Sequence, residues 1–93
     1  MTVQDVFSIR GRGTVVTGQI ESGSLNVGDE ISFQRQGSFI KKTVVTGIEA
    51  FRKQLASAQA GDNVGVLLRD INKPEIHCGD VLVGSDSEFS WNP

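Results

Sequence analysis

Apolar residues in this chain recur mostly at every second position within short runs, which is the spacing of strands that bury one face. Residues 3–9 follow this period, with Val3, Phe7 and Ile9 on one side. The run 14–20 is dense in Val and Thr, whose branched side chains suit an extended backbone. Gly, Asn and Asp form the turns between the runs. The pattern predicts six strands, at residues 3–9, 14–20, 30–33, 40–49, 63–69 and 81–83.

Three segments complicate this pattern. Gly47 lies inside the fourth predicted strand, where it suggests a bulge or a tight barrel corner. Residues 51–58 are the only stretch with helical propensity, and they predict either an irregular extension of the strand or a helix of at most about two turns. Residues 73–76 predict one helical turn, because Pro74 stands early in it and its missing N–H costs nothing there.

Six strands and hardly any helix predict an all-β barrel or sandwich. A closed barrel is favoured, because closure removes the exposed edges that an open sheet of so short a chain would leave. The 93 residues suffice for one small domain. We expect this domain at residues 1–83, followed by a tail at 84–93 that is polar except for Phe89 and Trp91, two candidates for docking.

The composition is that of a globular protein, with 38% hydrophobic and 22% charged residues. No apolar run is long enough to span a bilayer, so we expect no membrane association. The first residues lack the apolar core of a secretory signal, so we expect a cytoplasmic protein.

The net charge of −2 argues against a protein that binds nucleic acid through bulk electrostatics. Basic residues gather in three places, at Arg10 with Arg12, at Lys41 with Lys42, and at Arg52 with Lys53. Any contact with RNA would therefore be local. Each pair taken alone also fits an ordinary solvated surface.

The chain offers little for metal binding or nucleophilic catalysis. Cys78 is the only cysteine, so neither an internal disulfide nor a thiolate cluster can form. His77 stands beside it, but neighbouring residues of an extended chain point to opposite faces and are poorly placed to share a ligand. We expect a solvent-facing His77 and a half-buried Cys78 near a turn. The single histidine also gives no Ser–His–carboxylate constellation.

Nucleotide-binding motifs are imitated but incomplete. The segment 13–18 has the glycine spacing of a P-loop, yet Gln19 and Ile20 occupy the places of the lysine that binds the phosphates and the hydroxyl that binds magnesium. Residues 11–13 begin like a dinucleotide-binding fingerprint, but no third glycine follows in register. Residues 72–75 resemble a guanine-specificity motif, with Glu75 in place of aspartate. We therefore expect no GTP binding, no cofactor and no enzyme activity.

Residues 5–18, Asp-Val-Phe-Ser-Ile-Arg-Gly-Arg-Gly-Thr-Val-Val-Thr-Gly, closely resemble the opening of domain 2 of elongation factor Tu. The likeness continues in order along the chain, at residues 21–23, 27–30, 46–49, 51–53, 60–65 and 67–69. It covers about residues 3–83 with almost no gap.

This resemblance implies a closed six-stranded antiparallel barrel of Greek-key type. In the full-length factor the domain packs against the GTPase domain and helps to form the pocket for the aminoacyl end of transfer RNA. Carried over by position, the residues that line this pocket are Asp5, Phe7, Thr17, Glu49 and Asn63, with Glu49 beside the terminal adenine and Asn63 near the amino-acid moiety. Arg52 and Lys53 follow the adenine-contacting segment and would meet nearby phosphates.

The chain also departs from the family. Ala50 stands for the usual methionine, Asp70 for the usual glycine and Cys78 for a usually charged residue, and the tail does not resemble a linker into a third domain. The sequence contains no GTPase domain to gate transfer RNA binding. We expect an isolated barrel to bind the aminoacyl end weakly, since only part of the contact surface is present.

Three interpretations follow. The chain is a stand-alone domain that binds RNA or a translation-related protein, which Met1 and the unfamiliar tail favour; or it is an excised fragment of a full-length translational GTPase; or, least favoured, it is an independent enzyme. The transfer RNA acceptor end is the RNA partner that the resemblance implies.

Overall fold

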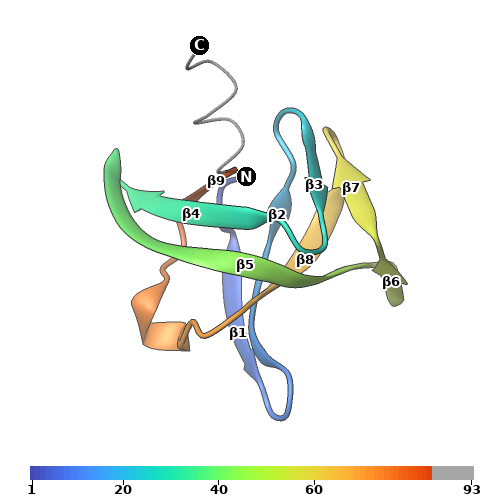
Figure 1. The fold of residues 1–93 in the computed structure, drawn as a ribbon, viewed down its shortest axis with the longest axis horizontal. Coiled ribbons are helices and arrows are strands. Elements are labelled where there is room, and N and C mark those ends of the chain that lie inside the picture. Colours follow the sequence, from blue (N-terminus) through green and yellow to red (C-terminus); the bar gives the residue numbers. More distant parts are fainter. Residues whose placement is uncertain (85–93) are drawn as a thin grey trace.

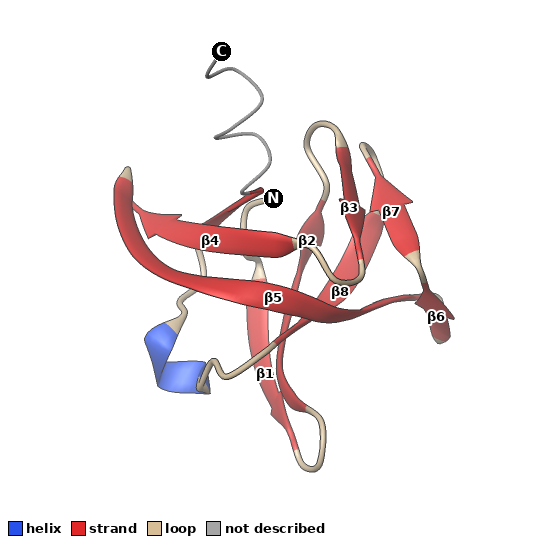
Figure 2. Cartoon of the chain, in the orientation of Figure 1, coloured by secondary structure: helices blue, strands red, loops and turns tan. Residues whose placement is uncertain are grey.

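The computed structural model describes residues 1–84, which form short strands around one apolar core (Figure 1). Within residues 1–84, strands account for nearly all regular structure and the one helical element is a single 3₁₀ turn (Figure 2). The elements in chain order are β1 (Asp5–Ile9), β2 (Gly13–Gln19), β3 (Ser24–Asn26), β4 (Glu30–Arg35), β5 (Ser38–Ala50), β6 (Lys53–Leu55), β7 (Ser57–Gln59), β8 (Asn63–Leu68), η1 (Lys73–Glu75) and β9 (Val81–Gly84). The all-β prediction is confirmed. Phe89 and Trp91 lie outside the described residues.

The strands pair antiparallel in two sheets. The larger sheet has seven strands in the order β1-β2-β8-β5-β4-β9, with β6 beside β5, and the smaller sheet pairs β3 with β7. The expectation of a closed barrel of six strands is therefore wrong in the number of strands and in closure. Nine strands are present in residues 1–84, because β3, β6 and β7 are three-residue ladders, too short to show an alternation in sequence.

The two ends of the larger sheet, β1 and β9, do not pair with each other in the described part of the chain. The segment before β1 lies against β9 instead. The Leu82 N–H donates to the Met1 carbonyl at 2.7 Å, the Val3 N–H donates to the Asp80 carbonyl at 2.8 Å, and Thr2 forms a single bridge with Val81. These contacts bring the sheet ends together without making a continuous ladder between two strands.

The core follows from the strand register. A row of directly opposed residues crosses the sheet on its inner face: Val6, Val16, Val66, Ile48 and Leu55. Val16 and Val66 are completely buried, as is Phe33 from β4. The period of two in the sequence thus selects the buried face, since every second side chain points inward.

The bulge predicted at Gly47 is confirmed. The β5–β8 register shifts between Val45 and Gly47, so that Thr46 is an extra residue on β5. The side chain of Leu67 lies over the glycine, with its Cδ1 atom 3.4 Å from where a Cβ would be.

The helical alternative for residues 51–58 is wrong. Phe51 and Arg52 form a two-residue turn, and the chain then continues into β6 and β7. Leu55 and Ala58 pack toward the core, and this tertiary contact outweighs the small difference in helical propensity that the segment carries. The single helical turn predicted around Pro74 is confirmed as η1.

A charged network holds the segment around η1 to the sheet. The Arg35 guanidinium donates to both carboxylate oxygens of Asp80 at 2.9 Å and to the Glu75 carbonyl at 3.1 Å. Asp80 is buried and also accepts from the His77 N–H. His77 faces solvent as expected, but Cys78 is exposed rather than half-buried, because Ile76 and Asp80 take the inward positions.

Candidate functional site

The strand register assembles a row of residues on the outer face of the sheet. Asp5 on β1 lies opposite Thr17 on β2, Thr17 opposite Gly65 on β8, and Gly65 opposite Glu49 on β5. Gln54 on β6 continues the row beyond Glu49. Directly opposed residues point to the same face of a sheet. This row is one residue out of step with the buried Val16–Val66 row, so its side chains point away from the core.

Phe7 and Asn63 lie on the same outer face, by the alternation of their strands. Phe7 is two residues beyond Asp5 and 49% exposed. Asn63 begins β8, two residues before Gly65, and is exposed. The structure therefore gathers all five residues that the family resemblance assigns to the aminoacyl pocket on one face of four adjacent strands.

Two glycines on this face have no side chain, and side chains of the neighbouring strand lie close to the space that a Cβ would occupy. At Gly65, a Cβ would lie 3.3 Å from the Val15 Cγ1 atom, so Val15 and Thr17 lean over the glycine from β2. Gly47 is covered in the same way by Leu67. Beside Gly47 a cavity of about 200 Å³ opens, with Arg12, Glu49 and Gln54 at its wall. It is smaller than a usual ligand pocket. Of the predicted site residues, only Glu49 lines it.

Arg12 pairs with the Glu49 carboxylate. It reaches the cavity from the β1–β2 turn, where Gly11 and Gly13 adopt positive φ. Arg12 is 38% exposed and Glu49 is 29% exposed, so both remain accessible to a ligand. The sequence indicated Arg12 as part of a basic cluster but not as the partner of Glu49, because the pair joins residues 37 positions apart.

Arg52 and Lys53 do not join the five residues on the outer face. Lys53 lies opposite Ala50, one residue out of step with Glu49, so its side chain leaves the sheet on the other side. Arg52 stands in the two-residue turn itself. Arg52 and Lys53 are close to Glu49 in sequence, but they lie at the end of the β5–β6 hairpin and not in the row on the outer face.

Phe51, in the same turn, was not predicted as a site residue. Its side chain is 91% exposed, and both Phe51 (φ 53°) and Arg52 (φ 64°) adopt the left-handed conformation that favours glycine or asparagine. An exposed aromatic residue held in a strained turn is typical of binding surfaces. Nothing in the residue types Phe-Arg indicates a turn of this kind, so the sequence carried no signal for it.

The family model of elongation factor Tu domain 2 matches residues 13–83, which is most of the chain. The chain belongs to this family. The match begins at β2 and extends into β9, so it contains Thr17, Glu49, Arg52, Lys53 and Asn63. Asp5 and Phe7 lie before the matched residues and join the site through the pairing of β1 with β2.

The described structure also bears on three other features: a metal site, a membrane span and the P-loop-like segment. Within residues 1–84, no group of three His, Cys, Asp or Glu side chains is placed to hold a metal ion. No helix in that part is long and apolar enough to cross a membrane. Gly13–Gln19, which contains the P-loop-like spacing, is strand β2 and pairs with β1 on one side and β8 on the other.

Proposed function

We propose that this domain is a non-catalytic binding module whose outer face, on β1, β2, β8 and β5, receives the aminoacyl end of transfer RNA. The observation that supports this most directly is the cross-strand row from Asp5 through Thr17 to Glu49. The row brings together residues from three separate parts of the sequence, and Phe7 and Asn63 flank it.

The residue types suit an aminoacyl-adenosine end. Phe7 offers an exposed ring for stacking, and Glu49 and Thr17 offer hydrogen-bonding groups for a base or a ribose hydroxyl. Asp5 offers a negative charge to the free ammonium group of the amino acid. Asn63 can both donate to and accept from the amino-acid moiety. Arg52 and Lys53 at the hairpin end would meet phosphates further along the strand, with the exposed Phe51 between these residues and Glu49.

The absence of catalysis is part of the proposal. Residues 13–18 are held in the central ladder of the sheet, so their N–H groups are not arranged as a loop around a phosphate. Gln19 and Ile20 supply neither the positive charge nor the magnesium ligand of a P-loop. We therefore propose that the chain itself does not bind GTP. A role in translation would place it in the cytoplasm.

The test is a titration with an aminoacyl-adenosine mimic, followed by backbone amide chemical shifts. We expect shifts centred on Thr17, Glu49 and Asn63, and their loss in Glu49→Gln. Asp70→Asn is the matched control, because it also removes one exposed carboxylate, in the turn between β8 and η1 and outside the proposed site. The absence of shifts at millimolar mimic, or equal shifts in Glu49→Gln, would contradict the proposal.

A second candidate function is contact with a protein, such as the GTPase domain of a translation factor or another translation-related protein. It is favoured by the exposed apolar side chains of Phe7 (49%) and Ile9 (38%) on β1. The proposed site serves equally well in a stand-alone protein and in part of a longer factor. Under this alternative, Ile9→Ser should weaken pull-down by such a partner, while the shifts that the mimic causes at Asn63 remain, because Ile9 is not among the residues assigned to the aminoacyl site.

A further inference from the structure

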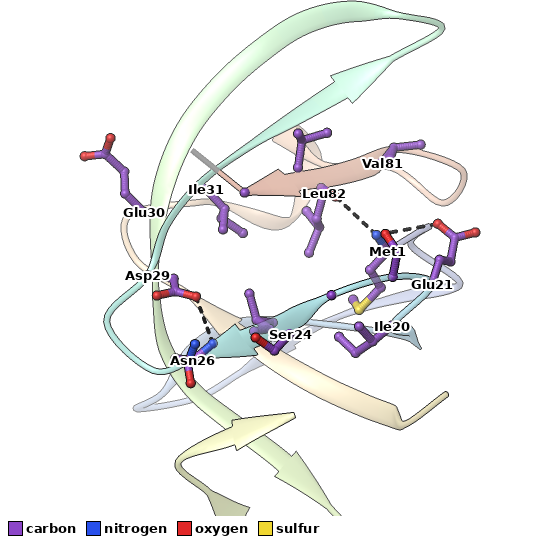
Figure 3. A pocket seen from close by; sticks show the side chains of 15 residues that line it. Met1, Ile20, Glu21, Ser24, Asn26, Asp29, Glu30, Ile31, Val81 and Leu82 are labelled. Atoms are coloured by element: carbon purple, nitrogen blue, oxygen red, sulfur yellow. Dashed lines mark hydrogen bonds and ion pairs between the residues drawn. The ribbon is translucent and has the colours of Figure 1, made fainter. Parts of the chain in front are cut away.

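A second hollow, of about 500 Å³, is shown in Figure 3. The strands β3 and β9 beside it lie at the end of the molecule away from the β1–β2 hairpin (Figure 1). Its walls come from three segments distant in sequence: the turn after β2 together with β3, the start of β4, and β9. Met1 closes one side. None of the residues assigned to the aminoacyl site lines this hollow.

The floor of the hollow is apolar. Ile20, Ile31 and Leu82 form it and are almost fully buried, with exposed fractions of 5%, 1% and 7%. Leu25 and the Met1 side chain pack beside them and are only partly covered. An apolar side chain entering here would remove this remaining surface from water.

The rim of the hollow is acidic. Glu21, Asp29 and Glu30 stand around it, and no Lys, Arg or His is among the described residues that line it. The one positive group, the Met1 ammonium, is already engaged: it donates to the Leu82 carbonyl at 3.1 Å and lies 3.6 Å from the Glu21 carboxylate. An occupant that brings its own positive charges is therefore favoured over an anionic one.

The side of β3 that faces away from β7 borders the hollow. Gly23 and Val27 direct their backbone groups to β7, since the Gly23 carbonyl accepts from Ala60 and the Val27 N–H donates to Ala56. Asn26 and Ser24 alternate with them and face the other way. The backbone of Asn26 is hydrogen-bonded to Asp29: its N–H donates to the Asp29 carboxylate, and its carbonyl accepts from the Asp29 N–H. The Ser24 N–H and carbonyl therefore lie on the edge of β3 that, within residues 1–84, pairs with no other strand.

We propose that this hollow binds an extended peptide segment of a partner protein, in which one apolar side chain is flanked by Lys or Arg two residues away on each side, because side chains at every second position of an extended chain point to the same face. The peptide backbone pairs with Ser24, the apolar side chain enters between Leu25 and Leu82, and the flanking cations lie over Glu21 and Glu30. A strand edge beside an apolar hollow selects an extended chain, because main-chain hydrogen bonds give affinity and the hollow gives side-chain specificity.

The experiment uses the full 93-residue chain and the capped peptide acetyl-Lys-Ser-Leu-Ser-Lys-amide, followed by backbone amide shifts at low salt. We expect shifts at Ser24, Leu25 and Leu82, and weaker binding as salt screens the rim. Glu30→Gln should raise the dissociation constant about 2- to 5-fold, the range of an exposed ion pair. Asp70→Asn, a matched carboxylate away from the hollow, should leave it unchanged.

Two further peptides separate the charge and the apolar contributions. Replacing both lysines of the peptide by glutamate should abolish the shifts, and replacing its leucine by serine should do the same. Equal binding of the acidic peptide, no shifts at millimolar lysine peptide, or shifts confined to the outer face around Glu49 would overturn the proposal. Because the two surfaces share no residue, either can fail its titration without affecting the other.

Discussion

At the residue scale, Glu49 has the most specific surroundings of the predicted site residues. It lines the small cavity beside Gly47, lies between Gly65 and Gln54 in the polar row across the sheet, and pairs with Arg12 from a distant turn. The arginine pairs with the carboxylate at the wall of this small cavity, and both side chains remain partly exposed. A ligand that contacts Glu49 therefore meets an ordered charge pair, and Arg12 joins Glu49 as a residue whose replacement should alter binding.

Two glycines in β-strands should differ in their tolerance of a methyl group. A Cβ at Gly18 would overlap the Thr2 carbonyl oxygen, whereas one at Gly47 would make only a close contact with the flexible Leu67 side chain. Gly18→Ala should lower the free energy of unfolding by about 1–3 kcal/mol, the usual cost of overpacking. Gly47→Ala should cost less. Urea denaturation followed by circular dichroism gives both values, and equal losses would contradict this reasoning.

Leu68 tests the assignment of the core. Its side chain is 3% exposed and belongs to the main apolar cluster. Leu68→Ala should cost about 2–4 kcal/mol in the free energy of unfolding, because it leaves a cavity that neighbouring strands fill only in part. Ile40→Ala, at a residue that is 38% exposed, is the control and should cost clearly less. Similar denaturation midpoints for the two variants would argue against this core.

At the element scale, the turn of the β5–β6 hairpin holds two residues, Phe51 and Arg52, in an unfavourable backbone conformation. Asparagine and glycine adopt the left-handed region at the lowest cost, which is why they dominate two-residue hairpin turns. Replacing the pair with Phe51→Asn and Arg52→Gly should therefore raise the free energy of unfolding by about 1 kcal/mol or more. Urea denaturation measures the gain. An unchanged or lower stability would show that Phe51 and Arg52 make stabilising contacts that outweigh the strain.

At the scale of the whole molecule, the Arg35–Asp80 pair holds the segment after β8 against the sheet. The Arg35 hydrogen bonds lower the pKa of the Asp80 carboxyl below its usual 3.8 despite its burial. The pKa of Glu75 is lowered from 4.5, first by the hydrogen bond from the Asn72 N–H and then by Lys41. Because both pKa values are depressed by folding, these groups contribute stability above their unfolded pKa values and lose it as the pH falls through the folded values.

Arg35→Met tests this network. The change keeps an apolar stem but leaves the Asp80 carboxylate buried without its partner, so stability at neutral pH should fall by about 2–3 kcal/mol. The deficit should shrink as the pH falls below 3.8, the usual pKa of this carboxyl, because the wild type loses its charged pair as the pH passes through the lowered pKa of Asp80 while protonation relieves the variant. Denaturation curves between neutral and acidic pH measure both effects. Lys41→Met, which removes a more exposed pair with Glu75, should cost clearly less.

Local alternation made most of the fold predictable. The β-branched runs around Val16 and Val66 fixed which residues form long strands and which side of each is buried, since side chains alternate strictly along a strand. Gly47 marked its bulge because a glycine inside a β-branched run is typical of bulges. The three-residue strands β3, β6 and β7 were not predictable, because their pairing is decided by contacts such as those of Leu55 and Ala58 with the core.

The sequence alone determined the all-β class and the family, because these depend on local pattern and on the order of short motifs. The residues of the aminoacyl site stay a prediction from the family resemblance. Only the tertiary structure decided what lies together in space. The register placed Asp5, Thr17 and Glu49 in one row, set Lys53 on the other side of the sheet, and brought Arg12 to Glu49. It also formed the acidic hollow from β3, β4 and β9. These contacts join residues far apart in sequence, so they depend on the pairing of whole strands and on no local pattern.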